Sequence, residues 1–182
     1  MKNKIEKKST ILQGGIIGLG KMGILHSVIV NSSENSNLLA ICDNDSMSGK
    51  VFSSFNSNIP IYNNYEKMIN NENLDFIFIA TPPDSHIPIA IACARENIPF
   101  FVEKPLCMKT SDSNALLKVL EEYPVINMVG FMKRYLNSFL KVKKILSDNV
   151  LGKVFTCHST AYVSQLFKRG KGWRYKKDKS GG

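Results

Sequence analysis

The chain has 182 residues, a length that suits one domain, or one domain and part of a second. Its content of 43% hydrophobic and 21% charged residues is ordinary for a globular protein. No apolar run approaches the ~18 residues of a membrane-spanning helix, and the lysine-rich N-terminus leads into a strand rather than a targeting signal, so we expect a cytoplasmic protein. The net charge of +9 is uneven, because residues 1–130 carry 11 Lys/Arg and 13 Asp/Glu whereas residues 131–182 carry 13 and 2.

Short apolar strands alternate with helices over the first 130 residues. The pattern predicts strands at 10–18, 37–43, 59–63, 75–83, 98–105 and 125–131, and helices at 21–31, 46–56, 65–71, 85–97 and 111–123. Continuous apolar strands separated by helices indicate a parallel sheet covered on both faces. We therefore expect an α/β fold with a doubly wound, Rossmann-type sheet.

The pattern changes near residues 133–135, and we predict a domain boundary between 132 and 133. One helix at 136–152, a long β-branched strand at 153–167 and a basic stretch follow. A lone strand is not stable without about two further strands or a packed helix. Residues 133–182 therefore read as the incomplete start of an α+β second domain, and the chain as the front part of a longer or prematurely ended protein.

Three glycines stand where the first strand meets the first helix. Gly18 permits a tight turn, Gly20 leaves no side chain between the backbone and a ligand, and Gly23 lets the helix pack closely on the strand. The free N–H groups at such a helix start favour a pyrophosphate. The alternative is a plain strand-to-helix turn.

Asp43 ends the second strand, 20 residues after Gly23. An acidic residue there accepts hydrogen bonds from ribose hydroxyls and repels a 2′-phosphate, which favours NAD as the cofactor over NADP. The alternative is a cap for the next helix, but Asn44 or Asp45 can supply that cap and leave Asp43 free. Residues 1–132 are thus predicted to be a dinucleotide-binding domain.

The predicted fourth and fifth strands end in prolines or in polar and charged residues. Thr81, Pro82 and Pro83 end the fourth strand and open the crevice where ligands bind. Glu103 and Lys104 end the fifth, where partial desolvation would lower the pKa of Lys104 and suit it to proton transfer. The alternatives are simple strand termination and a solvated charge pair.

The four cysteines and two of the histidines are predicted to have structural roles and not to bind a metal. Cys42, Cys93, Cys107 and Cys157 lack metal-ligand spacing, so we expect free buried thiols in a reducing compartment and no metal. We expect His26 to be a surface or packing residue, and His158 to be structural.

The order of motifs resembles the Gfo/Idh/MocA family of nicotinamide-dependent sugar and polyol oxidoreductases. The motifs are GGIIGLGKMGILH, ICD, IATPPDSHIPIAIACARENIPFFVEKPLC, VGFMKRY and GWRYKKDKSGG, and the resemblance covers residues 11–182. It implies hydride transfer between a nicotinamide and a secondary alcohol of a sugar, inositol or sugar nucleotide.

The resemblance also assigns residues to roles. Lys104 matches the catalytic lysine that contacts the reacting hydroxyl, and Glu103 lies beside the nicotinamide ribose. The other cofactor-binding positions are Gly18, Leu19, Gly20, Lys21, Met22, Gly23, Asp43, Thr81, Pro82 and His86. Arg134, Trp173 and Arg174 match positions near the substrate cleft.

The family's later segment, with an Asp and a His that complete the active site, has no counterpart here. We therefore expect a chain that binds cofactor but is catalytically incomplete, and a homo-oligomer at full length. The alternative is a non-enzymatic dinucleotide-binding sensor or assembly protein. The basic, aromatic stretch near Trp173 also resembles a single-strand nucleic-acid binder, but we favour no nucleic-acid partner, because the stretch belongs to the family's own pattern.

Overall fold

Six parallel strands form one sheet in the order β3-β2-β1-β4-β5-β6. The computed structural model describes residues 11–45, 58–160 and 162. The strands are β1 (Leu12–Ile17), β2 (Ser36–Cys42), β3 (Ile61–Tyr62), β4 (Phe76–Ile79), β5 (Phe100–Val102) and β6 (Asn127–Val129). The strand order reverses between β1 and β4, which is the position where doubly wound sheets bind ligands. The predicted Rossmann-type fold is confirmed.

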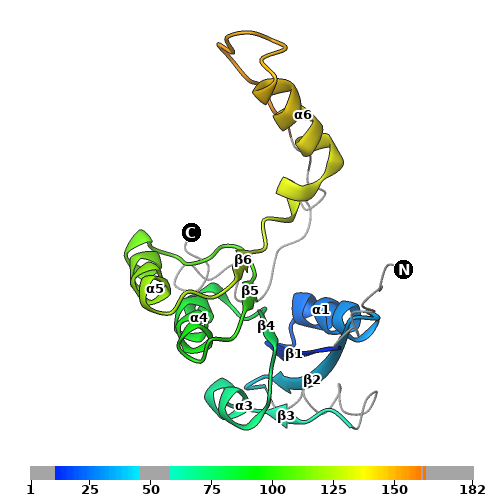
Figure 1. The fold of residues 1–182 in the computed structure, drawn as a ribbon, viewed down its shortest axis with the longest axis vertical. Coiled ribbons are helices and arrows are strands. Elements are labelled where there is room, and N and C mark those ends of the chain that lie inside the picture. Colours follow the sequence, from blue (N-terminus) through cyan, green and yellow to red (C-terminus); the bar gives the residue numbers. More distant parts are fainter. Residues whose placement is uncertain (1–10, 46–57, 161, 163–182) are drawn as a thin grey trace, which may run out of the picture.

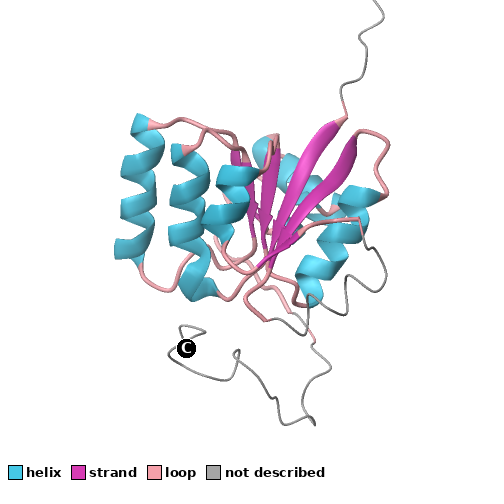
Figure 2. Ribbon diagram, turned by 90° about the horizontal axis from the view of Figure 1, so that it is seen from below, coloured by secondary structure: helices cyan, strands magenta, loops and turns pink. Residues whose placement is uncertain are grey.

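Helices lie on both faces of the sheet (Figures 1 and 2). They are α1 (Lys21–Asn31), α3 (Tyr65–Asn71), α4 (His86–Arg95), α5 (Thr110–Glu122) and α6 (Asn137–Ser147), with short 3-10 helices η1 (Pro83–Ser85) and η2 (Met132–Tyr135). The predicted helices at 21–31 and 65–71 match their observed bounds. The helix predicted at 46–56 lies outside the described residues.

The core has two parts because both faces of the sheet are buried. Ile77 and Ile79 pack in one cluster beneath α4, whereas Ile16, Val30 and Ile41 pack in a second cluster beneath α1. Fully burying such a side chain stabilises the fold by about 1.5–3 kcal/mol. Buried and half-buried residues alternate along β4, so this strand contributes side chains to the clusters on both faces of the sheet.

The chain after β6 leaves the sheet. Figure 1 shows α6 projecting away from the strands, and none of its residues is buried. It is shorter than the predicted helix at 136–152. In the part of the chain that the structure describes, no helix is long and apolar enough to cross a membrane.

The strand predicted at 153–167 is wrong for its described residues. Residues 153–160 have no regular secondary structure and are exposed. A strand needs a neighbour to accept its backbone hydrogen bonds, and no described strand lies beside this segment. The domain boundary predicted after residue 132 falls inside η2 and stays a prediction.

Replacement of one core isoleucine tests the packing. Ile77→Ala is expected to lower the free energy of unfolding by about 2–5 kcal/mol, because its side chain is 0% exposed. Ile126→Ala is the matched control, since Ile126 is 82% exposed and its loss should change stability by less than about 0.5 kcal/mol. Equilibrium urea unfolding measures both, and equal losses would contradict the described core.

Candidate functional site

The turn between β1 and α1 is closed by contacts that only glycine permits. Gly18 has φ +98°, and a Cβ there would lie 2.8 Å from the carbonyl carbon of Ala80. A Cβ on Gly23 would lie 1.7 Å from the Gly18 carbonyl oxygen. A Cβ on Gly20 would meet nothing within 4 Å. Gly18 and Gly23 therefore bring helix and strand together, whereas Gly20 faces open space.

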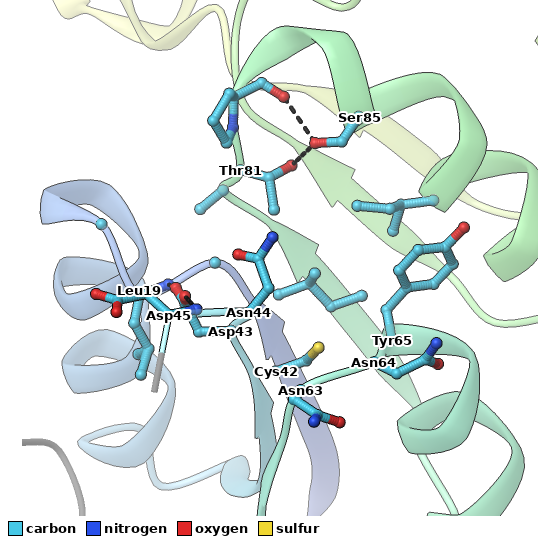
Figure 3. A pocket seen from close by; sticks show the side chains of 16 residues that line it. Leu19, Cys42, Asp43, Asn44, Asp45, Asn63, Asn64, Tyr65, Thr81 and Ser85 are labelled. Carbon is cyan, nitrogen blue, oxygen red and sulfur yellow. Dashed lines mark hydrogen bonds between the residues drawn. The ribbon is translucent and has the colours of Figure 1, made fainter. Parts of the chain in front are cut away.

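A cleft of about 500 Å³ opens beside this turn, at the carboxyl ends of β1, β2 and β4 (Figure 3). Its lining residues are Ile17, Gly18, Leu19, Gly20, Cys42, Asp43, Asn44, Asp45, Asn63, Asn64, Tyr65, Ala80, Thr81, Pro82, Ser85 and Ile89. Such a volume is within the range of small-molecule sites. The sequence predicted six of these residues as cofactor-binding, namely Gly18, Leu19, Gly20, Asp43, Thr81 and Pro82.

The amino end of α1 borders the cleft through its N-cap residue, Gly20. Gly20 is the N-cap, no side chain caps the helix, and its first turn holds no acidic residue. The first N–H groups of a helix lack intrahelical acceptors and carry partial positive charge. An anion at Gly20 would therefore find unused hydrogen-bond donors and no repelling carboxylate on the helix.

Asp43 ties the end of β2 to the glycine turn. One carboxylate oxygen accepts the N–H of Leu19 at 2.5 Å, and the other accepts the N–H of Asp45 at 2.7 Å. The Asp43 carboxylate therefore orders the turn as well as lining the cleft. The helix that Asn44 or Asp45 was expected to cap lies outside the described residues. Each oxygen keeps a second lone pair for a ligand hydroxyl.

Thr81 and Pro82 form the opposite wall. The Ser85 hydroxyl lies 2.8 Å from both Thr81 Oγ1 and the Pro82 carbonyl oxygen, so η1 is closed against the end of β4 (Figure 3). The sequence reasoning did not single out Ser85. Its spacing of four residues from Thr81, across the start of a helix, was the available signal.

His86 does not line the cleft, although the resemblance placed it among the cofactor-lining residues. Its side chain is 1% exposed, and its ring contacts the carbonyl oxygens of Thr81 and Pro105. The first turn of α4 carries the ring inward, behind the wall that Thr81 forms. A ligand in the cleft would meet that wall and not the imidazole.

His26 makes a side-chain contact with Glu103 that the sequence reasoning missed. Its Nε2 lies 2.9 Å from Glu103 Oε1, and the two side chains are only 12% and 10% exposed. Its ring also packs against Phe78 and Phe101, with centroid distances of 5.0 and 5.2 Å. Position 26 lies three residues after the buried Gly23, so helical spacing could have placed it on the inner face of α1.

Glu103 and Lys104 differ in exposure. Glu103 is 8% exposed, and its Oε2 accepts the backbone N–H of Lys104 at 3.2 Å. The Lys104 side chain is exposed, so the partial desolvation expected at this position is not present. Glu103 is thus held in place, whereas Lys104 has a fixed backbone and a side chain in solvent.

A second cavity of about 330 Å³ lies on the other side of the α1 start. Its lining residues are Met22, Leu25, His26, Phe101, Glu103, Met128, Gly130, Phe131, Met132 and Tyr135. Met22 and Glu103 therefore face this cavity and not the first one. Lys21 is exposed and Gly23 is buried in packing, and neither lines a described cavity.

Arg134, one of the predicted substrate residues, does not line the cleft. Arg134 is exposed on η2, with its guanidinium carbon 5.5 Å from the ring centre of Phe131. Trp173 and Arg174 lie outside the described residues. Among those residues, no group of three or more His, Cys, Asp or Glu side chains could hold a metal ion.

The four cysteines are free, as expected, but only Cys42 and Cys93 are buried. Burial raises the pKa of the Cys42 thiol from its ordinary 9.0 to about 12, and the negative charge of Asp43 adds to the rise. Burial likewise raises the pKa of Cys93 to about 12. Cys42 therefore lines the cleft as a neutral thiol.

Comparison with known proteins places these features in a family. The model of the Gfo/Idh/MocA oxidoreductase family, described as having an NAD-binding Rossmann fold, matches residues 12–131. A 2,7-anhydro-N-acetylneuraminate hydratase of Mediterraneibacter gnavus is 25% identical over 92% of this chain and 44% of its own length. A myo-inositol 2-dehydrogenase of Thermotoga maritima is 26% identical over 76% of this chain and 42% of its own.

Solved structures are similar as well. Myo-inositol 2-dehydrogenase from Lactobacillus plantarum has a TM-score of 0.71 and 34% identity, covering 79% of this chain and 43% of that chain. The chain spans about half the length of the curated relatives it matches.

Two glycine variants separate packing from access. Gly23→Ala is expected to cost about 3 kcal/mol of unfolding free energy, because its Cβ would overlap a backbone oxygen. Gly20→Ala should change stability by less than about 0.5 kcal/mol, since its φ of −65° suits alanine and no atom lies near. Urea unfolding measures the unfolding free energy of both variants. A Gly23→Ala protein as stable as the wild type would contradict the described contact.

Thiol labelling tests the burial of Cys42. The thiolate is the reactive form, so iodoacetamide at about pH 8 should modify the exposed Cys157 and leave Cys42 and Cys93 unmodified until the chain is unfolded.

The Cys42 thiol also makes stability depend on pH. It loses its proton near pH 9 in the unfolded chain and near pH 12 in the folded chain. The contribution of Cys42 to stability is therefore full below pH 9 and is lost as pH rises toward 12.

Peptide mass spectrometry identifies the labelled cysteines. Modification of Cys42 as fast as Cys157 in the folded chain would contradict this assignment.

Proposed function

The chain belongs to the Gfo/Idh/MocA oxidoreductase family, with its NAD-binding Rossmann fold, and from this premise we propose that it holds NAD in the cleft beside Gly20 for hydride transfer to or from a polyol. The observation that carries the proposal is the open space at Gly20, where the backbone can approach a pyrophosphate without any intervening side chain.

The residues present fit the dinucleotide. The uncapped start of α1 would bind the pyrophosphate, and Asp43 would accept hydrogen bonds from the adenosine ribose while disfavouring a 2′-phosphate. Thr81 and Pro82 would form the wall opposite. Glu103 and Met22, which line the second cavity, would lie toward the nicotinamide half.

Lys104 is proposed to handle the proton of the reacting hydroxyl. When bound, the nicotinamide supplies the hydride chemistry. The Lys104 ammonium would donate to the substrate oxygen and stabilise negative charge on it as the proton moves. Glu103 would fix the backbone from which that side chain extends, through its bond to the Lys104 N–H.

A cyclic polyhydroxylated molecule is the proposed substrate class, because relatives are named as inositol dehydrogenases and as a hydratase of an anhydro sugar. The free thiols support a reducing compartment such as the cytoplasm. Homo-oligomer formation remains part of the proposal. The second candidate is a non-enzymatic dinucleotide-binding protein, and the exposed side chain of Lys104 favours it.

Cofactor titration tests the proposal. NADH should bind more tightly than NADPH, and Asp43→Asn should weaken NADH binding about tenfold while reducing the preference over NADPH. Asp84→Asn is the control, because Asp84 is exposed and does not line the cleft. Fluorescence titration of NADH measures each affinity.

Gly20→Ala supplies an independent variant. It should keep the fold and lose NADH affinity, since its methyl group would occupy the space proposed for the pyrophosphate. Unchanged affinity in both Asp43→Asn and Gly20→Ala would exclude this cleft as the cofactor site.

A further inference from the structure

Both ring nitrogens of His86 contact backbone carbonyl oxygens. Nδ1 lies 2.8 Å from the Pro105 oxygen, and Nε2 lies 2.9 Å from the Thr81 oxygen. A carbonyl oxygen can only accept a hydrogen bond, so each contact requires an N–H on the ring. A neutral imidazole has one N–H, and the two contacts together require two.

No carboxylate compensates the ring in the described part of the chain, where His86 takes part in no ion pair. The elements packed against α4 include η1, α3 and α5. Their exposed charged groups, together with the one that follows β5, are Glu66, Lys67, Asp84, Lys104, Lys118, Glu121 and Glu122. Asp112 on α5 is half-buried, Arg95 lies at the far end of α4, and the Glu103 carboxylate contacts His26. The two carbonyl dipoles are therefore the direct stabilisation of charge on this ring, which is 1% exposed.

The two carbonyls belong to segments with different proposed roles. Thr81 follows β4 and lines the cleft, whereas Pro105 directly follows Lys104 at the end of β5. A single ring thus joins the wall of the cleft to the segment that carries the candidate proton-transfer group. A neutral ring would direct one nitrogen lone pair at a carbonyl oxygen and loosen one of these links.

We propose that His86 is a positioning residue that carries hydrogen on both ring nitrogens and holds the Thr81 wall and the Lys104–Pro105 segment at one separation. The geometry of the cleft and the place of Lys104 are then set together. The part that concerns Lys104 rests on the function proposed above.

Nitrogen NMR of the histidine rings tests the protonation directly. The spectrum is recorded on the ¹⁵N-histidine-labelled chain at about pH 7.5, where ring nitrogens with and without hydrogen differ in chemical shift. His86 should show hydrogen on both. His26→Gln and His158→Gln assign the three rings, and a His86 ring with one bare nitrogen would overturn the proposal.

A variant tests the positioning role. His86→Phe keeps a ring of similar size without donors, and it should weaken NADH binding about tenfold at a temperature where circular dichroism shows the chain folded. His158→Phe, at an exposed position, should leave the affinity unchanged. A merely structural role would lower the stability of His86→Phe and leave the NADH affinity of the folded chain as in the wild type, and that result would overturn the positioning role.

The experiments distinguish a failure of the proposed function from a failure of the proposal about His86. Absence of NADH binding by the wild-type chain would contradict the proposed function, while the ring spectrum would still decide the protonation of His86.

Discussion

The close approach of α1 to the sheet is the constraint on which the rest of the structure depends. It needs hydrogen in place of a side chain at Gly18, against Ala80, and at Gly23, against the Gly18 oxygen. A methyl group at either position would push the helix outward. Because α1 starts where the strand order reverses, this packing also determines where its free N–H groups point.

Three polar contacts then connect α1 and the strand ends. Asp43 bonds the glycine turn to β2, His26 bonds α1 to Glu103 after β5, and His86 bonds the ends of β4 and β5 behind the cleft. Buried or half-buried hydrogen bonds to charged groups are stronger than neutral ones and more costly to break. The two cavities on either side of the α1 start therefore have walls that are cross-linked rather than independent.

Local pattern was sufficient for most of the fold. The helix at 21–31 and the alternation of strands with helices follow from hydrophobic period and from glycine and proline positions, which are properties of neighbouring residues. The same reasoning failed for residues 153–160. Their β-branched composition predicts a strand, but strand formation depends on a partner that local sequence does not contain.

The sequence by itself determined the parallel sheet, the glycine turn and the placement of Gly18, Gly20 and Asp43 at strand ends that border the cleft. Only the tertiary structure decided that Asp43 bonds the turn, that His26 meets Glu103 across 77 positions and that His86 turns away from the cleft. It also decided that Lys104 stays exposed. The reason is physical: the partner of a polar side chain is whatever the packed elements bring within about 3 Å, and sequence spacing does not encode that distance.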